Sequence, residues 1–139
     1  MTNKPLVVID TSVFISALLS SNLNSAPNQV ISRWRNGDFI LIMTPQIEEE
    51  IALLLTRKQV KEEMIVSLFD AFDDLAFYQE GIYETNFLDN IDPKDNIFLS
   101  ACYESKADYL VSLDKHLLNL KHFHQTLIFN PQSFLNQLC

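Results

Sequence analysis

Glycine is scarce in this chain, and so are positive charges. Only 2 of the 139 residues are glycine, and neither a GxGxxG nor a GxxxxGK pattern occurs, which excludes the common glycine-rich nucleotide cradles. Lys and Arg number 10 against 18 Asp and Glu, giving a formal net charge of −8. Taken alone, this balance disfavours nucleic acid as a partner, because phosphate contacts need cations. The acids either keep the protein soluble or gather locally to hold metal cations.

Cysteines and long apolar runs are also few. Cys102 and Cys139 lack the spacing of a metal site, so free thiols in a reducing cytoplasm fit better than a disulfide. No apolar run reaches the about 18 residues of a membrane span, and the N-terminus lacks the layout of a signal peptide. The sequence therefore predicts a soluble, cytoplasmic protein without a membrane segment.

Strands and helices alternate over what we expect to be one domain, residues 1–139. Short apolar, β-branched runs predict strands at residues 6–9, 39–43, 109–113 and 126–129, with a further short strand at 81–85. Apolar spacing, caps and prolines predict helices at residues 13–19, 27–36, 45–56, 60–77, 92–105, 114–120 and 131–138. The alternation predicts an α/β fold in which helices cover both faces of a central parallel sheet, an α/β/α sandwich.

Four carboxylates stand at positions from which they can converge. Asp10 and Asp114 each follow a predicted strand, Asp95 opens a predicted helix, and Glu50 lies on another. Ligands of parallel α/β folds collect beyond the carboxyl ends of the strands. A carboxylate cluster without His or Cys suits hard cations such as Mg²⁺ or Mn²⁺. The mutual repulsion of four such acids would itself require a cation.

The same carboxylates have plainer interpretations. Asp10 and Asp114 are suitable N-caps for the helices that follow them, and Asp95 stands three residues after Asp92, as in a capping box. The protein would then be a non-catalytic α/β binding module. A third hypothesis is that the protein is a different Mg²⁺-dependent phosphohydrolase with Asp10 as the covalent nucleophile. Ser12 stands where that chemistry usually has a second acid.

The choice of glutamate depends on its apolar neighbours. Glu50 ends a run of three glutamates, which is typical of solvated surface. Ile47 and Ile51 flank it, so Glu50 lies at the edge of the predicted buried face of its helix. Glu49 remains the alternative.

Four segments, in order along nearly the whole chain, resemble a known family. They are VVIDTSVFISALL, TPQIEEEIALLLTRKQV, DPKDNIFLSACYESKADYLVSLDKHLL and FNPQSFLNQL. These segments resemble the sequence blocks of PIN-domain ribonucleases, and within them the toxins of toxin–antitoxin pairs related to VapC-type toxins. The resemblance implies a parallel sheet flanked by helices, a Mg²⁺ or Mn²⁺ cofactor, and hydrolysis of RNA phosphodiester bonds by a type II toxin.

The resemblance also implies which residues form the site. The catalytic acids fall on Asp10, Glu50, Asp95 and Asp114. The expected metal ligands among them are Asp10, Asp95 and Asp114. Hydroxyl groups with supporting roles fall on Thr11, Ser12 and Ser112. The sequence departs from the family at Leu113, where Gly or Arg is frequent, and at Lys58, where Pro is common.

The implied partners are an RNA substrate, a small antitoxin protein and a second copy of the chain in a homodimer. RNA binding has to overcome the net charge of −8, so local groups of cations matter. Arg33 and Arg35 lie near each other on one predicted helix, and Arg57 and Lys58 form a second group. We expect phosphate contacts from these residues.

Overall fold

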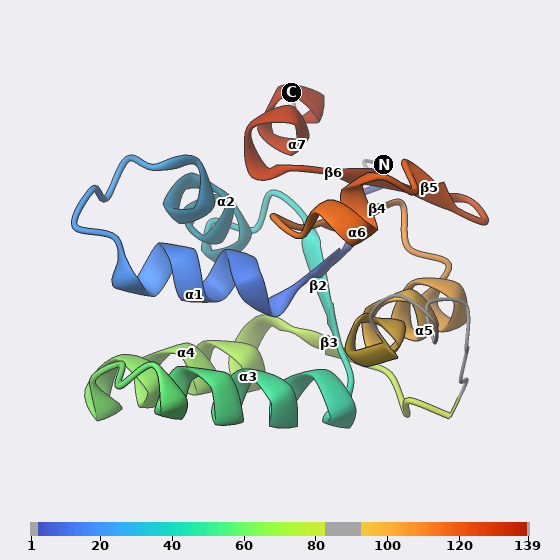
Figure 1. The fold of residues 1–139 in the computed structure, drawn as a ribbon. Helices are drawn as coiled ribbons and strands as arrows, with labels where there is room; N and C mark the ends of the chain where they lie inside the picture. The colour runs from blue at the N-terminus through green and yellow to red at the C-terminus, as the bar shows by residue number, and fades with distance from the viewer. Residues whose placement is uncertain (1–2, 83–92, 139) are drawn as a thin grey trace.

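The computed structural model describes residues 3–82 and 93–138, and a six-stranded sheet lies at its centre (Figure 1). The strands are β1 (Leu6–Ile9), β2 (Ile40–Met43), β3 (Phe77–Tyr78), β4 (Tyr109–Val111), β5 (His122–Phe123) and β6 (Thr126–Phe129). Their order across the sheet is β3-β2-β1-β4-β6-β5. The described strands pair in parallel, except β5 with β6. The predicted α/β fold with a parallel sheet is therefore confirmed, with one antiparallel strand at its edge.

Helices connect the strands. They are α1 (Thr11–Leu19), α2 (Ala26–Arg35), α3 (Pro45–Arg57), α4 (Glu62–Leu75), the 3₁₀ turn η1 (Pro93–Asp95), α5 (Asn96–Ser105), α6 (Lys115–Leu118) and α7 (Pro131–Gln137). The side chains of Ser25, Thr44 and Asn130 accept hydrogen bonds from backbone N–H groups in the first turns of α2, α3 and α7. Each of these three helices also has Pro in its first turn, where a missing N–H costs nothing. Within residues 3–82 and 93–138, no helix has the length and apolar character to cross a membrane.

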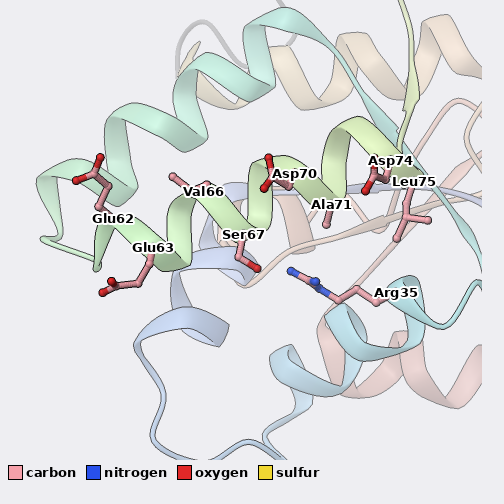
Figure 2. A pocket seen from close by; sticks show the side chains of 9 residues that line it. All are labelled: Arg35, Glu62, Glu63, Val66, Ser67, Asp70, Ala71, Asp74 and Leu75. Atoms are coloured by element: carbon pink, nitrogen blue, oxygen red, sulfur yellow. The ribbon is translucent and has the colours of Figure 1, made fainter.

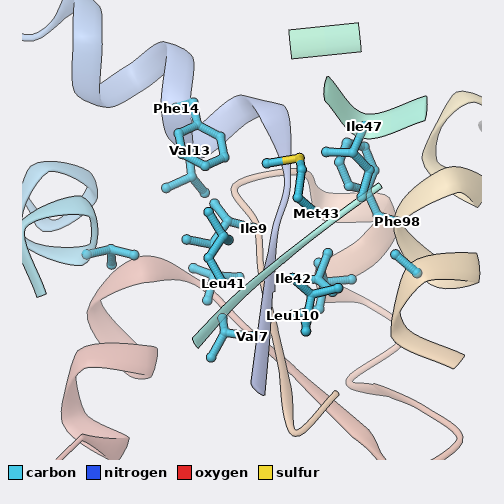
Figure 3. Close-up of a cluster of buried hydrophobic side chains, with 14 of the residues drawn as sticks. Val7, Ile9, Val13, Phe14, Leu41, Ile42, Met43, Ile47, Phe98 and Leu110 are labelled. Atoms are coloured by element: carbon cyan, nitrogen blue, oxygen red, sulfur yellow. The ribbon is translucent and has the colours of Figure 1, made fainter. Parts of the chain in front are cut away.

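Both faces of the sheet are covered, which explains its continuous apolar strands. Successive residues of β2 point to opposite faces. Figure 3 shows Leu41 on the side that carries Val13 of α1, and Ile42 with Leu110 on the side that carries Phe98 of α5. All five side chains are buried. The core thus consists of two apolar layers, one on each face.

Aromatic rings attach α4 to this core. The ring of Phe72 lies 5.5 Å from that of Phe14 on α1 and 5.7 Å from that of Trp34 on α2, measured between centroids. All three side chains are buried. The opposite face of α4 is left to solvent.

The third strand differs from the sequence prediction. Phe77 and Tyr78 pair with Ile42 and Met43 of β2, and α4 therefore ends at Leu75 rather than at residue 77. Residues 81–82 form no strand, and the rest of the strand predicted at 81–85 lies outside the described residues. Gly81 has a φ of 74°, which an extended strand does not accommodate. A strand of two residues leaves no alternating pattern to detect.

The edge hairpin is a second difference. β5 is absent from the sequence prediction, and it pairs antiparallel with β6, with His122 opposite Leu127. Lys121 and His124 have positive φ values of 64° and 54°, and they let the chain reverse around this short strand. α6 is also shorter than predicted and ends at Leu118.

The strand order reverses at β1. The chain proceeds from β1 to β2 and β3 on one side, and then returns to β4 and β6 on the other. β1 and β4 are consequently neighbours, with Val7 opposite Tyr109 and Ile9 opposite Val111. The crevice beyond the carboxyl ends of the strands at such a reversal is the usual ligand position in open parallel sheets.

Candidate active site

Asp10 directly follows β1 at this reversal, and its side chain is only 4% exposed. Its backbone N–H donates to the Val111 carbonyl oxygen of β4 at 3.0 Å. Oδ1 accepts a hydrogen bond from the backbone N–H of Ser12 at 2.8 Å, so Asp10 does cap α1. Oδ2 accepts a hydrogen bond from the hydroxyl of Ser112. Capping therefore accounts for one carboxylate oxygen but not for the burial or for the second oxygen.

Two serines join the turn after β1 to the turn after β4. The buried Ser112 hydroxyl donates to Asp10 and accepts from the backbone N–H of Asp114 at 2.9 Å. The Ser12 hydroxyl accepts from the backbone N–H of Leu113 at 3.1 Å. These bonds fix Asp10 beside Asp114, although the two acids are far apart in the sequence.

The charges of these two acids interact. Burial raises the pKa of Asp10, hydrogen bonds from Ser112 and Ser12 oppose that rise, and the negative charge of Asp114 adds to it. Asp114 is partly buried, and its Oδ1 accepts a hydrogen bond from the backbone N–H of His116 at 2.8 Å, so it caps α6. A nearby cation would stabilise the ionised form of Asp10.

Glu50 reaches the same edge from α3. The Thr11 hydroxyl donates to Oε2 of Glu50 at 3.0 Å, and Thr11 is 2% exposed. Because Thr11 directly follows Asp10, this bond attaches α3 to the end of β1. Glu49 is exposed. The contact with Thr11 favours Glu50 over Glu49 as the glutamate of the site.

Asp95 is buried at the junction of η1 and α5, with 7% of its surface exposed. It is the N-cap residue of α5, but its side chain makes no capping hydrogen bond. Asp92, its partner in the capping-box interpretation, lies outside the described residues. The burial of Asp95 therefore needs a reason other than helix capping.

The donor set fits a hard divalent cation in its chemistry. The four predicted acids offer carboxylate oxygens alone, the ligands that Mg²⁺ and Mn²⁺ prefer. In the part of the chain that the structure describes, however, no group of three or more His, Cys, Asp or Glu side chains is close enough to hold one ion. Instead, the hydroxyl groups of Ser112 and Thr11 link the positions of Asp10, Asp114 and Glu50.

The two cations predicted on α2 have acidic surroundings. Arg33 forms an ion pair with Asp38. Arg35 borders a hollow of about 690 Å³ between α2 and α4, and Figure 2 shows its side chain extended toward Ser67. The acids of α4 that line this hollow are Glu62, Glu63, Asp70 and Asp74. These negative charges disfavour an RNA phosphate at Arg33 or Arg35.

The two members of the second predicted group of cations, Arg57 and Lys58, differ in their surroundings. Arg57 lines a hollow of about 420 Å³ that also contains Glu50. Lys58, the C-cap residue of α3, is exposed and does not line this hollow. Lys94 in η1 does line it. Sequence reasoning misses Lys94, whose only signal is its place directly before Asp95.

Together, the fold and the site define an α/β protein with carboxylates beyond the ends of two adjacent parallel strands, where the strand order reverses. Residues 6–116 match the family model of the PIN domain, and the chain belongs to this family. The resemblance to PIN domains seen in the sequence is thereby confirmed. PIN domains are generally nucleases that use divalent metal ions, so the family assigns this chain to the nucleic-acid hydrolases as a class.

Two known proteins show the extent of the similarity. Uncharacterized protein MJ1680 of Methanocaldococcus jannaschii is 31% identical over 129 residues, which cover 89% of this chain and 80% of that protein. A chain in the crystal structure of VapBC2 from Rickettsia felis, bound to a DNA fragment from their promoter, matches with a TM-score of 0.62. It is 13% identical, and the match covers 90% of this chain and 98% of that chain. This second similarity supports the fold.

Proposed function

We propose that this chain is a Mg²⁺- or Mn²⁺-dependent endoribonuclease and the toxin of a type II toxin–antitoxin pair. The observation that carries the proposal is the buried Asp10 carboxylate, held by Ser112 beside Asp114 in a chain of a nuclease family. Burying a carboxylate costs folding free energy unless its charge is offset. A helix cap needs no such burial, so the cost points to a functional role.

The residues have distinct proposed roles. The ligands of the ion are Asp10, Asp95 and Asp114. A divalent ion supplies Lewis-acid chemistry, because it offsets negative charge on the phosphate and makes water easier to deprotonate. The Ser112 hydroxyl orients the Asp10 carboxylate, and Thr11 orients Glu50, which positions the attacking water. Ser12 keeps the two turns together through Leu113.

The proposed partners rest on the family and on the structural neighbour. Similarity in fold to a chain of VapBC2 supports an antitoxin protein as the partner. We further propose RNA as the substrate, a homodimer as the assembly and the cytoplasm as the compartment. Light scattering of the purified protein tests the dimer, and co-purification with the product of an adjacent small gene tests the antitoxin.

A non-catalytic binding module is the second candidate, because Asp10 and Asp114 do cap α1 and α6. The phosphohydrolase with Asp10 as nucleophile has less support. Ser12, at the position of its second acid, serves instead as a hydrogen-bond acceptor for the backbone of Leu113.

A cleavage assay with a mixed RNA pool separates these candidates. The purified protein should cleave RNA with Mg²⁺ or Mn²⁺, and a chelator, Asp10→Asn or Asp114→Asn should each abolish cleavage. Activity that survives either substitution would contradict the proposed site. A binding module would show no cleavage, and its thermal stability would not respond to millimolar Mn²⁺.

A further inference from the structure

A groove runs along α3 next to the candidate active site. Its volume is about 420 Å³. The residues that line it are Gln46, Glu49, Glu50, Leu53, Leu54, Arg57 and Lys94. All of them belong to α3 except Lys94, which comes from η1, directly before α5. α3 and α5 are in contact, and η1 leads directly into α5 (Figure 1).

One side of the groove is a single face of α3. Gln46, Glu50, Leu53 and Arg57 follow each other at spacings of four, three and four residues, which places them on one side of a helix. At a rise of about 1.5 Å per residue, this face extends for roughly 16 Å from Gln46 to Arg57. Glu50 therefore lies within the groove, with Arg57 about two turns further along.

Both walls of the groove connect directly to the proposed catalytic acids. Glu50 on the α3 wall accepts the hydrogen bond from Thr11, the residue after Asp10. Lys94 on the opposite wall directly precedes the buried Asp95. The groove thus shares Glu50 with the candidate active site.

The groove contains two cations, Arg57 and Lys94, and two acids, Glu49 and Glu50. Among the described residues, neither Arg57 nor Lys94 makes an ion pair, whereas Arg33 is paired with Asp38. Leu53 is 51% exposed and adds an apolar surface. Unpaired cations that share a groove with an exposed apolar side chain are elements of a site for single-stranded nucleic acid.

We propose that this groove holds single-stranded RNA on one side of the scissile phosphate, with Arg57 and Lys94 in contact with backbone phosphates and Leu53 against a base or sugar. The inference rests on the proposed ribonuclease function and assigns its substrate path. The net charge of −8 repels RNA from the protein as a whole, so binding depends on local cations. A short concave groove suits a single strand with splayed bases, whereas duplex RNA is recognised over a wider surface.

Binding to a fluorescein-labelled single-stranded RNA of mixed sequence, followed by anisotropy with a chelator present, tests the groove without cleavage. Arg57→Ala and Lys94→Ala should each weaken binding roughly 5- to 10-fold, and the slope of log affinity against log salt should fall by about 0.7 for each contact removed. Arg57→Lys should retain part of the binding. The matched control is Lys61→Ala. The Lys61 side chain is exposed, lies outside the groove and makes no capping hydrogen bond to α4.

The outcomes separate this inference from the proposed function. Weaker binding in both groove variants with an unchanged Lys61→Ala supports the groove, even if the protein proves unable to cleave RNA. Cleavage of RNA by variants whose affinity, KM and salt slope match the wild type would overturn the groove and leave the nuclease function intact. A wild-type protein that binds no RNA, or that binds duplex RNA equally well, would also overturn it.

Discussion

Two acidic regions of this protein differ in how far their carboxylates are exposed to water. The larger hollow, between α2 and α4, is lined by four acids that are all exposed to water. At the ends of β1 and β4 the acids are fewer, but Asp10 and Asp95 are 4% and 7% exposed. Water screens the charges of the exposed acids on α4, whereas the charges of the buried Asp10 and Asp95 must be stabilised by hydrogen bonds or a cation. Our proposed site therefore rests on the burial of charge and not on the number of acids or the size of a hollow.

The largest expected difference between the two regions is in catalysis. Asp10→Asn should lower kcat/KM for RNA cleavage by more than about 100-fold, because it removes a proposed metal ligand. Asp70→Asn, the same substitution in the larger hollow, should leave the rate unchanged. Initial rates on one RNA with Mn²⁺ give the measurement. Similar losses in both variants would remove the distinction between the regions.

The second largest expected difference between the two regions is in the stability that Mn²⁺ adds. At a concentration 100 times its Kd, an ion that binds only the folded state adds about 2.7 kcal/mol to the free energy of unfolding. We expect Asp114→Asn to reduce this gain and Asp74→Asn, in the larger hollow, to keep it. Urea titrations with and without Mn²⁺ measure the effect. If the stability gained from Mn²⁺ were lost in Asp74→Asn but kept in Asp114→Asn, the ion would bind in the larger hollow and the proposed site would be wrong.

Removing a single hydroxyl should have a smaller effect. Ser112→Ala deletes the hydrogen bond to Asp10 and the acceptor for the Asp114 N–H. It should cost about 1–3 kcal/mol of stability and about 10- to 100-fold in activity. Ser67→Ala, at an exposed position in the larger hollow, is the control and should change neither quantity by a measurable amount. Calorimetry and cleavage rates of the two variants check this expectation.

The smallest expected effect is that of the ion pair between Arg33 and Asp38, which is only partly buried. The hydrogen bond from Arg33 lowers the pKa of Asp38 in the folded protein. The pair therefore adds stability above the unfolded value of 3.8 and loses it as the pH falls through the lower folded value. Asp38→Asn should shift the urea midpoint slightly at neutral pH, because solvent screens the pair, and not at strongly acidic pH. An equal shift of the urea midpoint at both pH values would show that the charge of Asp38 does not contribute to stability.

The sequence predicts the elements that have a strong local signal. The apolar run before Asp10 and the run before Asp114 are strands, and the α/β fold follows from their alternation with helices. β3 and β5 escape prediction because each is only two residues long, so each depends on pairing with a longer neighbour rather than on its own pattern.

The sequence indicates only part of the arrangement around the proposed site. Strand ends and the family resemblance point to Asp10 and Asp114, and the structure joins them through Ser112. Spacing on a helix also suggested Arg33 and Arg35, but their acidic neighbours come from a loop and from α4, which no local pattern reveals. For the same reason the sequence alone misses the second wall of the α3 groove.

The bonds between the two serine-linked turns join residues 101 and 102 positions apart, Ser12 to Leu113 and Asp10 to Ser112. Closing so long a loop is entropically costly and slow relative to local contacts. A nascent chain that has not yet emerged from the ribosome beyond β4 carries Asp10 without the residues that hold it. Under the proposed endoribonuclease function, this delay would keep an unfinished molecule from cleaving the RNA of the ribosome that is making it.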